Sequence, residues 1–399
     1  MTVTNHTHQQ QASTTYAVLF AASGCHMIND TLQAVMLSSY PLLRDTFTLT
    51  FAQIGLITMV FQVTASILQP LIGLYTDKKP LPYILPVAPA LTLLGFIFLA
   101  LAPSYAIILI AAGTIGMGSS VFHPDASRVA RLASGGRYGF AQATFQVGGN
   151  FGTAMGPLLA AAIVLPFGQS SYAWFTLLAI ASIVILSGVG RWYSNHLEQK
   201  KSAPATSKTS PFRNRTISFA LTLLVLLMFS KFVYTSSLHS FYTFYLIDHF
   251  GVSQRNAQIY LFILLGAIAV GTFAGGPIGD KIGTKKVILF SILGALPFTL
   301  ALPHMDLFWT VALTIPIGLI ISSAFAAMVV YAQDLLPGRV GMISGLFFGL
   351  AFGMGGMGAA ILGRIADASS IDYVFQLCAF LPALGLLAFL LPDKPQQRT

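Results

Sequence analysis

Long apolar runs recur along the chain, and a short polar gap separates each run from the next. A helix needs about 20 mostly apolar residues to cross a bilayer. Twelve runs come close to that length, so the pattern predicts an all-α polytopic membrane protein. The predicted spans are 16–41, 51–75, 82–101, 105–127, 138–164, 172–191, 216–246, 256–279, 286–302, 307–334, 341–366 and 372–391.

Composition agrees with a chain surrounded by lipid. Only 8% of its residues are charged and 55% are hydrophobic, whereas a soluble domain carries roughly 25% charged residues. The 21 basic residues outnumber the 12 acidic ones, but they cluster in the polar gaps. They form no basic face, so nucleic-acid binding is not expected.

One polar gap is much longer than the others and divides the chain. It covers residues 192–215, contains Pro204 and Pro211, and reads as a cytoplasmic linker between bundles at 16–191 and 216–391. Polar tails precede and follow them at 1–15 and 392–399. If both termini are cytoplasmic, all but four of the 21 Lys and Arg residues lie at cytoplasmic positions. This bias predicts that orientation.

Three short motifs of the first half recur in the second half, in the same order and at nearly the same separation. They are Gly73-x-x-x-Asp77-Lys78 with Gly276-x-x-x-Asp280-Lys281, Ser119–Phe122 with Ser322–Phe325, and Gly136–Gly139 with Gly338–Gly341. A duplicated six-helix unit therefore predicts two six-helix bundles, with a binding site between them near the middle of the membrane.

Glycines recur every fourth residue in three predicted spans. The sets are Gly148, Gly152 and Gly156; Gly271, Gly275 and Gly279; and Gly341, Gly345, Gly349 and Gly353. This spacing puts each set on one helix face and allows close backbone approach. Static packing and a sliding contact between moving helices explain the pattern equally well.

The loop Gly276-Pro277-Ile278-Gly279-Asp280-Lys281-Ile282-Gly283 resembles the signature loop of the major facilitator superfamily. The stretch Gly73–Pro80 resembles a first-half copy that departs from the pattern at Pro80. Further runs resemble the superfamily's exporters of phosphonate antibiotics over about residues 16–393. These runs are Ser119–Pro124, Ser127–Arg131, Phe145–Phe151, Phe241–Leu246 and Leu335–Arg339.

The resemblance implies a bacterial inner-membrane antiporter that exports a small anionic drug while protons enter. It implies no cofactor, and we expect the chain to work as a monomer. It also implies charge latches at the cytoplasmic ends of the helices. Their residues would be Asp77, Lys78, Asp280, Lys281, Arg131, Asp334 and Arg339.

Ionisable residues inside spans are functional candidates, because a charge there costs several kcal/mol unless it is paired or hydrated. Asp30 lies mid-span, with His26 one turn away and Gln33 nearby. It is interpreted as a proton carrier or part of the substrate cavity, with a structural hydrogen bond as the alternative.

A second polar group, His123-Pro124-Asp125, is predicted to interrupt its helix, because proline removes a backbone hydrogen bond. Asp125 is a second candidate proton carrier, and Arg128 one turn later could neutralise it. His123 and Arg128 are also predicted to help bind substrate.

Lys231 is predicted mid-span in the second half, with Tyr234 along the same helix. Lys231 either pairs with Asp30 across the two halves or receives the anionic substrate, together with His123, Arg128, His26, Gln33 and Tyr234. The sequence alone does not separate these two roles.

The chain shows no nucleotide-binding loop, metal-ligand spacing or nucleophile motif, so neither an enzyme nor a metal site is predicted. Two alternatives to drug export remain. One is uptake or exchange of organic anions or phosphorylated metabolites, and the other is a membrane sensor that transports nothing.

Overall fold

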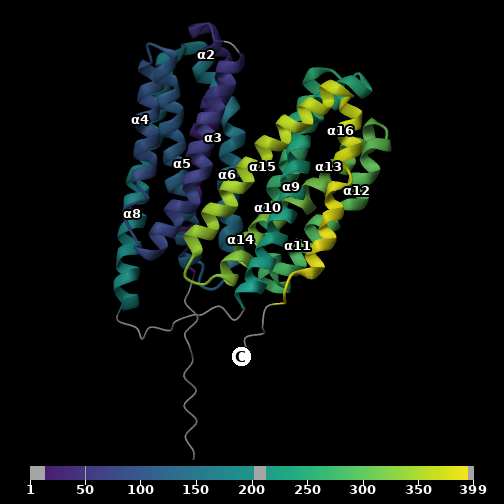
Figure 1. The fold of residues 1–399 in the computed structure, drawn as a ribbon. Helices are drawn as coiled ribbons and strands as arrows, with labels where there is room; N and C mark the ends of the chain where they lie inside the picture. Colours follow the sequence, from purple (N-terminus) through teal and green to yellow (C-terminus); the bar gives the residue numbers. More distant parts are fainter. Residues whose placement is uncertain (1–13, 50, 202–212, 394–399) are drawn as a thin grey trace, which may run out of the picture.

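The computed structural model describes residues 14–49, 51–201 and 213–393. Most of the predicted N-terminal tail, the end of the C-terminal tail and the middle of the predicted linker lie outside these residues. The described chain folds into two helical bundles, one from each half of the sequence (Figure 1).

Six predicted spans form the N-terminal bundle. Its elements are α1 (Tyr16–Ser38), α2 (Tyr40–Phe47), α3 (Phe51–Lys78), α4 (Val87–Leu101), α5 (Tyr105–Ala133), α6 (Tyr138–Leu159), the π-helix η1 (Ala160–Val164), α7 (Leu165–Phe167), the 3₁₀-helix η2 (Gln169–Phe175) and α8 (Thr176–Lys201).

The other six form the C-terminal bundle. Its elements are α9 (Asn214–Phe250), α10 (Gln254–Ile282), α11 (Thr284–Leu293), α12 (Leu296–Ala301), η3 (Leu302–His304), α13 (Leu307–Ser322), α14 (Ala324–Leu335), α15 (Val340–Ala368), α16 (Ile371–Cys378) and η4 (Leu381–Leu390).

Within the described residues, nine helices are long and apolar enough to cross a membrane. The other three predicted spans correspond to α1, α4 and α6. The helix α4 is short, at 15 residues. The helices α1 and α6 carry polar side chains such as Asn29 and Gln142, which lower their mean hydropathy. Twelve helical segments nevertheless pack into the two bundles, as predicted.

Several spans differ in detail from the predicted continuous helices. Span 286–302 breaks at Gly294 and Ala295 into α11 and α12, and span 372–391 divides into α16 and η4. Span 307–334 divides at Ser323, whose hydroxyl donates to the Ile320 carbonyl and so offers the backbone an alternative partner.

In two other places the helix continues further than the sequence predicted. The helix α5 runs unbroken past Pro124, so the predicted interruption there is wrong. The helix α8 continues to Lys201, so the first part of the predicted linker is helical.

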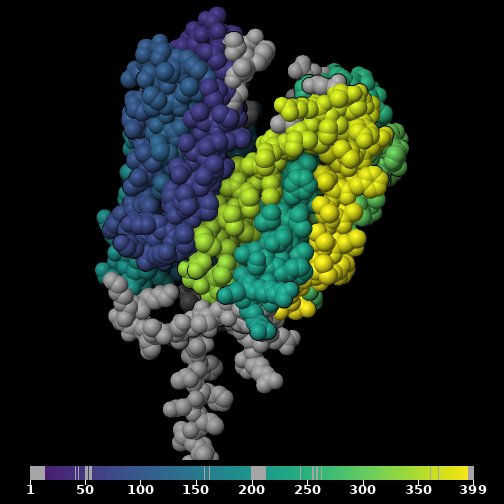
Figure 2. Space-filling view, in the orientation of Figure 1, coloured from purple at the N-terminus to yellow at the C-terminus, as the bar shows by residue number. Residues whose placement is uncertain are grey.

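The two bundles touch at one end and separate at the other (Figure 1). We call the closed end the base; it carries the start of α1, the end of α8 and the start of α9. We call the opposite end the mouth, where Figure 2 shows the surface hollowed between the bundles. The contacts between bundles run mainly from α15 to α3 and α5, and from α6 to α10 and α14.

Candidate functional site

Three ionisable side chains meet midway along α1 and α5. Nε2 of His26 lies 3.3 Å from Oδ2 of Asp30, and Nε2 of His123 lies 3.7 Å from Oδ1. All three residues are buried. The sequence predicted the His26–Asp30 pair but placed His123 with Asp125 instead. We call His26, Asp30 and His123 the trio.

Backbone carbonyls fix the orientation of both imidazoles. Nδ1 of His26 lies 2.8 Å from the Phe145 carbonyl oxygen, and Nδ1 of His123 lies 2.9 Å from that of Ser119. Because a carbonyl only accepts, each Nδ1 carries the hydrogen. In the neutral rings each Nε2 therefore presents a lone pair toward the Asp30 carboxylate. Three acceptors that face one another require a cation between them.

A proton meets that requirement, and a metal ion is the other possibility. The ligand atoms of the trio lie within 4.8 Å of one another, so this group could hold a metal ion. The sequence predicted no metal site, because these residues have no ligand spacing along the chain. Their proximity arises only from the packing of α1 against α5.

A small cavity reaches the trio from the mouth side. Its volume is about 120 Å³, and Asp30 forms part of its wall. The lining residues are Asp30, Gln33, Ala34, Leu37, Phe61, Gln62, Ala65, Ser66, Thr153 and Phe352. Asp30 and Gln33 therefore lie in a cavity between helices of both bundles.

Lys231 lies on α9, buried, and does not line this cavity. Its Nζ lies 4.7 Å from the ring centre of Phe232 and 5.2 Å from that of Phe325. Asp30 has histidine partners instead, so its predicted pairing with Lys231 is absent. Among the described residues, no carboxylate lies within salt-bridge distance of Lys231, which leaves its charge balanced only by aromatic faces.

Arg128 and Asp125 lie outside the cavity, near the base. Arg128 forms an ion pair with Asp125, as the sequence suggested. It also donates to Asp77 at 2.7 Å and to Thr76 at 2.8 Å. Thr76 in turn donates to Asp125 at 3.1 Å. Arg128 is thus bound to residues at the base of the molecule and does not lie in the predicted substrate site.

Both copies of the signature loop bind the opposite bundle at the base. Asp77, at the end of α3, accepts from the backbone N–H groups of Gly341 at 2.9 Å and Met342 at 2.8 Å, in the first turn of α15. Such a carboxylate satisfies unpaired N–H groups and favours the helix dipole.

Asp280, at the end of α10, does the same for α6. It accepts from the N–H groups of Gly139 at 2.7 Å and Phe140 at 2.8 Å. We call these two arrangements the Asp77 latch and the Asp280 latch. They are repeat equivalents, and each joins a carboxylate of one bundle to a helix start in the other.

Glycine makes the latches possible by allowing backbone contact. A Cβ added at Gly73 would overlap the backbone of Gly341, and one added at Gly276 would overlap Gly139. These pairs too are repeat equivalents. The stripe that begins at Gly341 therefore lies at the contact between bundles.

The stripe of Gly148, Gly152 and Gly156 instead packs on α1 within its own bundle. For that stripe, packing inside one bundle accounts for the small residues, and no sliding contact is needed.

A further ion pair crosses the base between Arg131 of α5 and Asp334 of α14. Arg131 also donates to Gln333 at 2.9 Å and lies over the Tyr138 ring at 4.0 Å. Arg131 and Asp334 thus join the two bundles at the base.

Four other residues singled out in the sequence lie elsewhere. Lys78, Lys281 and Arg339 are exposed at the base, and no ion pair within the described chain includes them. Tyr234 is 3% exposed and packs in the apolar core of the C-terminal bundle. None of the four lines the cavity.

The search for charged residues missed two groups. One is a buried amide–hydroxyl network across the bundles, in which Ser127 donates to Gln142 at 2.9 Å and lies 3.0 Å from the Ser344 hydroxyl, while Gln333 donates to Ser344 at 2.8 Å. Amides within predicted spans were the available signal. The other group consists of aromatic rings around the trio, which look like ordinary core residues in the sequence.

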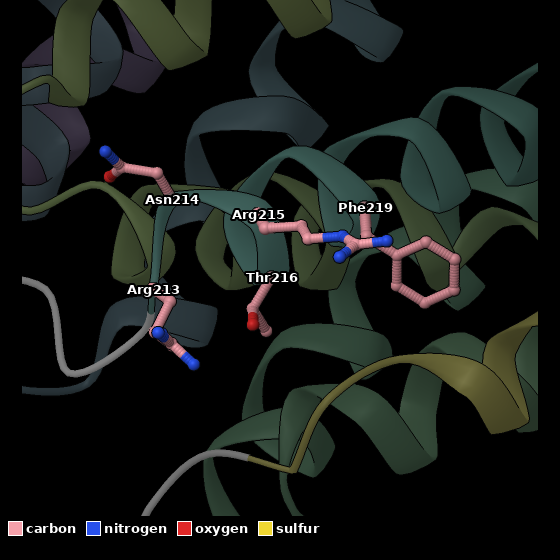
Figure 3. Close-up of a pocket in the computed structure, with 5 residues that line it drawn as sticks. All are labelled: Arg213, Asn214, Arg215, Thr216 and Phe219. Carbon is pink, nitrogen blue, oxygen red and sulfur yellow. The ribbon is translucent and has the colours of Figure 1, made fainter.

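A separate pocket lies at the base, far from the trio along the chain (Figure 3). Arg213, Asn214, Arg215, Thr216 and Phe219, at the start of α9, line it. It borders residues outside the described part of the chain. Two of its lining residues are basic, and none of the five belongs to the trio or the latches.

Two duplicated helical bundles, latched at one end and enclosing a cavity with a carboxylate in its wall, define a polytopic membrane carrier. The chain matches the model of the Major Facilitator Superfamily over residues 19–360 and 244–399. The chain therefore belongs to this superfamily of transporters and is not an enzyme.

Individual relatives cover nearly the whole chain. It is 54% identical over 384 residues to the Fosmidomycin resistance protein of Escherichia coli (strain K12), covering 96% of this chain and 95% of that protein. It is 43% identical over 400 residues to the Uncharacterized MFS-type transporter YfnC of Bacillus subtilis (strain 168), covering 98% and 97%. The solved structure of FucP in the outward conformation shares the fold, with a TM-score of 0.71, 19% identity and coverage of 95% and 99%.

Proposed function

We propose that this chain exports fosmidomycin or a closely related phosphonate from the bacterial cytoplasm in exchange for protons. The observation that carries the proposal is 54% identity over 96% of the chain to the Fosmidomycin resistance protein. The proposal is supported by a cavity at the bundle interface, a buried lysine without a carboxylate partner among the described residues, and the buried acceptor trio.

Transport by everted membrane vesicles with an imposed pH gradient tests the proposal. We expect uptake of labelled fosmidomycin when the vesicle interior is acidic, and none when the gradient is collapsed. Movement in the opposite direction, or gradient-independent exchange with phosphorylated metabolites, would establish the alternative carrier function instead.

The orientation follows from the distribution of basic residues. We place the base and both termini in the cytoplasm, so that the open mouth faces outward and the chain works as a single copy in the inner membrane. A cysteine replacing exposed Lys79 should resist an impermeant thiol reagent in intact cells, and one replacing exposed Asp306 should react. The reverse pattern would invert the orientation.

Asp30 is the better of the two candidate proton carriers. It lies in the cavity wall, and two imidazole nitrogens face it as acceptors. A proton shared within the trio removes the repulsion among these atoms. Asp125 is held by Arg128 and Thr76, so we assign it to the link between the base and the cavity rather than to proton binding from the mouth.

Two carboxamide variants separate these roles. Asp30→Asn is expected to abolish gradient-driven export while the protein still inserts, because an amide cannot carry the proton. Asp125→Asn should retain gradient dependence at a reduced rate. If both single variants and the double variant keep full coupling, the proton site lies elsewhere, with Asp334 next to be tested.

The same vesicles show whether the trio holds a metal ion instead of a proton. Export that survives a strong chelator supports the proton. Export that stops with the chelator and returns with Zn²⁺ would show that the trio is a metal site.

Lys231 is proposed as the countercharge for the phosphonate. A bare anion in a low-dielectric site costs several kcal/mol, and Lys231 is a buried cation without a carboxylate partner among the described residues. The Phe325 ring lies over Nζ of Lys231 in this conformation, so the substrate reaches Lys231 only when the rings or the bundles shift.

Binding of fosmidomycin to purified variants tests the lysine. Lys231→Ala should weaken binding at least about 10-fold, and Lys231→Arg should restore part of the loss, because guanidinium also binds phosphonate. Lys285→Ala is a matched control, since Lys285 pairs with Asp393 at the surface. Unchanged affinity in Lys231→Ala would leave that lysine a structural role only.

A further inference from the structure

We propose that Phe348 couples the proton site to the anion site, so that occupation of one changes the affinity of the other. Phe348 lies on α15 in the C-terminal bundle and is 2% exposed. This inference rests on the proposed function, because it connects the two sites named there. It adds a positioning residue that touches neither proton nor substrate.

On one side, the Phe348 ring covers the trio from the opposite bundle. Its centre lies 5.0 Å from that of His123, with 38° between the ring planes, and 6.2 Å from that of His26. An aromatic face stabilises a cation beside it. The ring therefore favours a protonated trio as long as it stays in place.

On the other side, Phe348 meets the aromatic surroundings of Lys231. Its centre lies 5.2 Å from that of Phe325, with the planes at 84°. Nζ of Lys231 lies 5.2 Å from the centre of the same Phe325 ring. Two rings in contact thus separate the lysine of one bundle from a histidine of the other.

The remaining neighbours of the trio are mostly uncharged. On α1, Asn29 donates to Asp30 at 3.0 Å. The helix α6 contributes the Phe145 carbonyl and Gly149, whose added Cβ would meet both His26 and Asp30. The helix α15 contributes the rings of Phe348 and Phe352. Within the described chain, the ion pairs of the trio involve N-terminal residues alone, and the opposite bundle brings aromatic rings to it.

This arrangement makes proton binding sensitive to the position of α15. All three members of the trio belong to the N-terminal bundle, whereas Phe348 moves with the C-terminal one. An anion that binds Lys231 replaces the aromatic rings as the partner of the lysine's positive charge and displaces Phe325. Phe325 is the ring against which Phe348 packs. The trio then loses its cover and releases its proton. By linkage, a protonated trio weakens anion binding by the same factor.

The experiment measures fosmidomycin affinity of the purified protein at one pH below and one above neutrality, together with proton release on substrate addition. In the wild type, coupling between two sites should change the affinity about 5-fold or more. Phe348→Leu keeps an apolar side chain but removes the aromatic face. The two affinities should converge to a ratio near one, and proton release should disappear.

Matched variants separate coupling from packing. Phe352 also lies against His123, at 5.6 Å, but within the described chain its ring does not stack on that of Phe325. Phe352→Leu should therefore keep the affinity ratio, whatever it does to the affinity itself. Phe348→Tyr retains the ring and should keep the ratio too. Phe325→Leu removes the middle contact and should lose it.

A wild-type affinity ratio in Phe348→Leu or in Phe325→Leu would overturn the inference while leaving the proposed function intact. Loss of the ratio in Phe352→Leu as well would also overturn it, because any ring beside His123 would then suffice. If the wild type binds no phosphonate, or binds it without proton release, the proposed function fails, and the inference fails with it.

Discussion

Removing the carboxylate of either latch should favour opening of the base, and the two removals should shift the opening equilibrium by different amounts. Within the described chain, Asp280 makes two backbone hydrogen bonds to α6 and no others, and it is exposed. Loss of such a cap costs about 1 kcal/mol, which changes an equilibrium about 5-fold. Asp280→Ala should therefore raise the population with an open base by about that factor.

Asp77→Ala should have a larger effect. Asp77 caps α15 and also binds the buried guanidinium of Arg128 at 2.7 Å. The Asp77 side chain is only 5% exposed, so water screens its hydrogen bonds to α15 less than those of exposed Asp280 to α6. The pair with Arg128 lies within the N-terminal bundle and adds nothing to the contact between bundles. A cap at the upper end of the usual range, about 2 kcal/mol, corresponds to a change of roughly 30-fold in the population with an open base.

Distance measurements between spin labels at the base provide the assay. Cysteines replacing exposed Lys79 and Lys286, in a background without Cys25 and Cys378, report the separation of the bundles. The control is Asp306→Ala. Asp306 caps α13 within one bundle, accepting from the Trp309 N–H at 2.9 Å.

The control should lower stability without changing the label distances. Equal distance distributions in Asp77→Ala and the wild type would refute the latch, as would an effect of Asp280→Ala larger than that of Asp77→Ala.

Two glycine variants test the contacts that the absent side chains permit. Gly149→Ala should abolish export without loss of insertion, because the added Cβ would lie 2.5 Å from the His26 ring and 2.7 Å from Asp30. Its control is Gly24→Ala, whose Cβ would have nothing within 4 Å, and this variant should export normally. Gly345→Val should hold the bundles apart at the base, because a Cβ there overlaps the α3 backbone at Gln69, whereas Gly353→Val, in open space, should leave the label distances unchanged. Normal export by Gly149→Ala, or a closed base in Gly345→Val, would contradict these contacts.

The apolar runs predicted the spans because hydropathy over a span depends on local composition alone, and the repeated motifs then predicted the two bundles. Local pairs were also accessible: His26 and Asp30, and Asp125 and Arg128, are one turn apart, and both pairs form. What the sequence could not provide was packing between helices. His123 joins Asp30 only because α5 lies against α1, and Phe348 covers them only because α15 crosses to the other bundle.

The motif copies show the same limit. Their recurrence pointed to the base, but the partners of Asp77 and Asp280 are backbone N–H groups. Such groups are present at every residue, so no side-chain pattern in the sequence distinguishes the ones that serve as partners.

The Arg131–Asp334 pair has a consequence for how the two halves recognise each other. The partners are 203 residues apart, close to the separation of the repeated motifs, so they occupy equivalent positions that face each other across the pseudo-twofold axis. Two copies of the N-terminal half assembled in the same way would set arginine against arginine, and two C-terminal halves would set aspartate against aspartate. Opposite charges at one duplicated position therefore favour pairing of the N-terminal half with the C-terminal half and disfavour pairing of two identical halves.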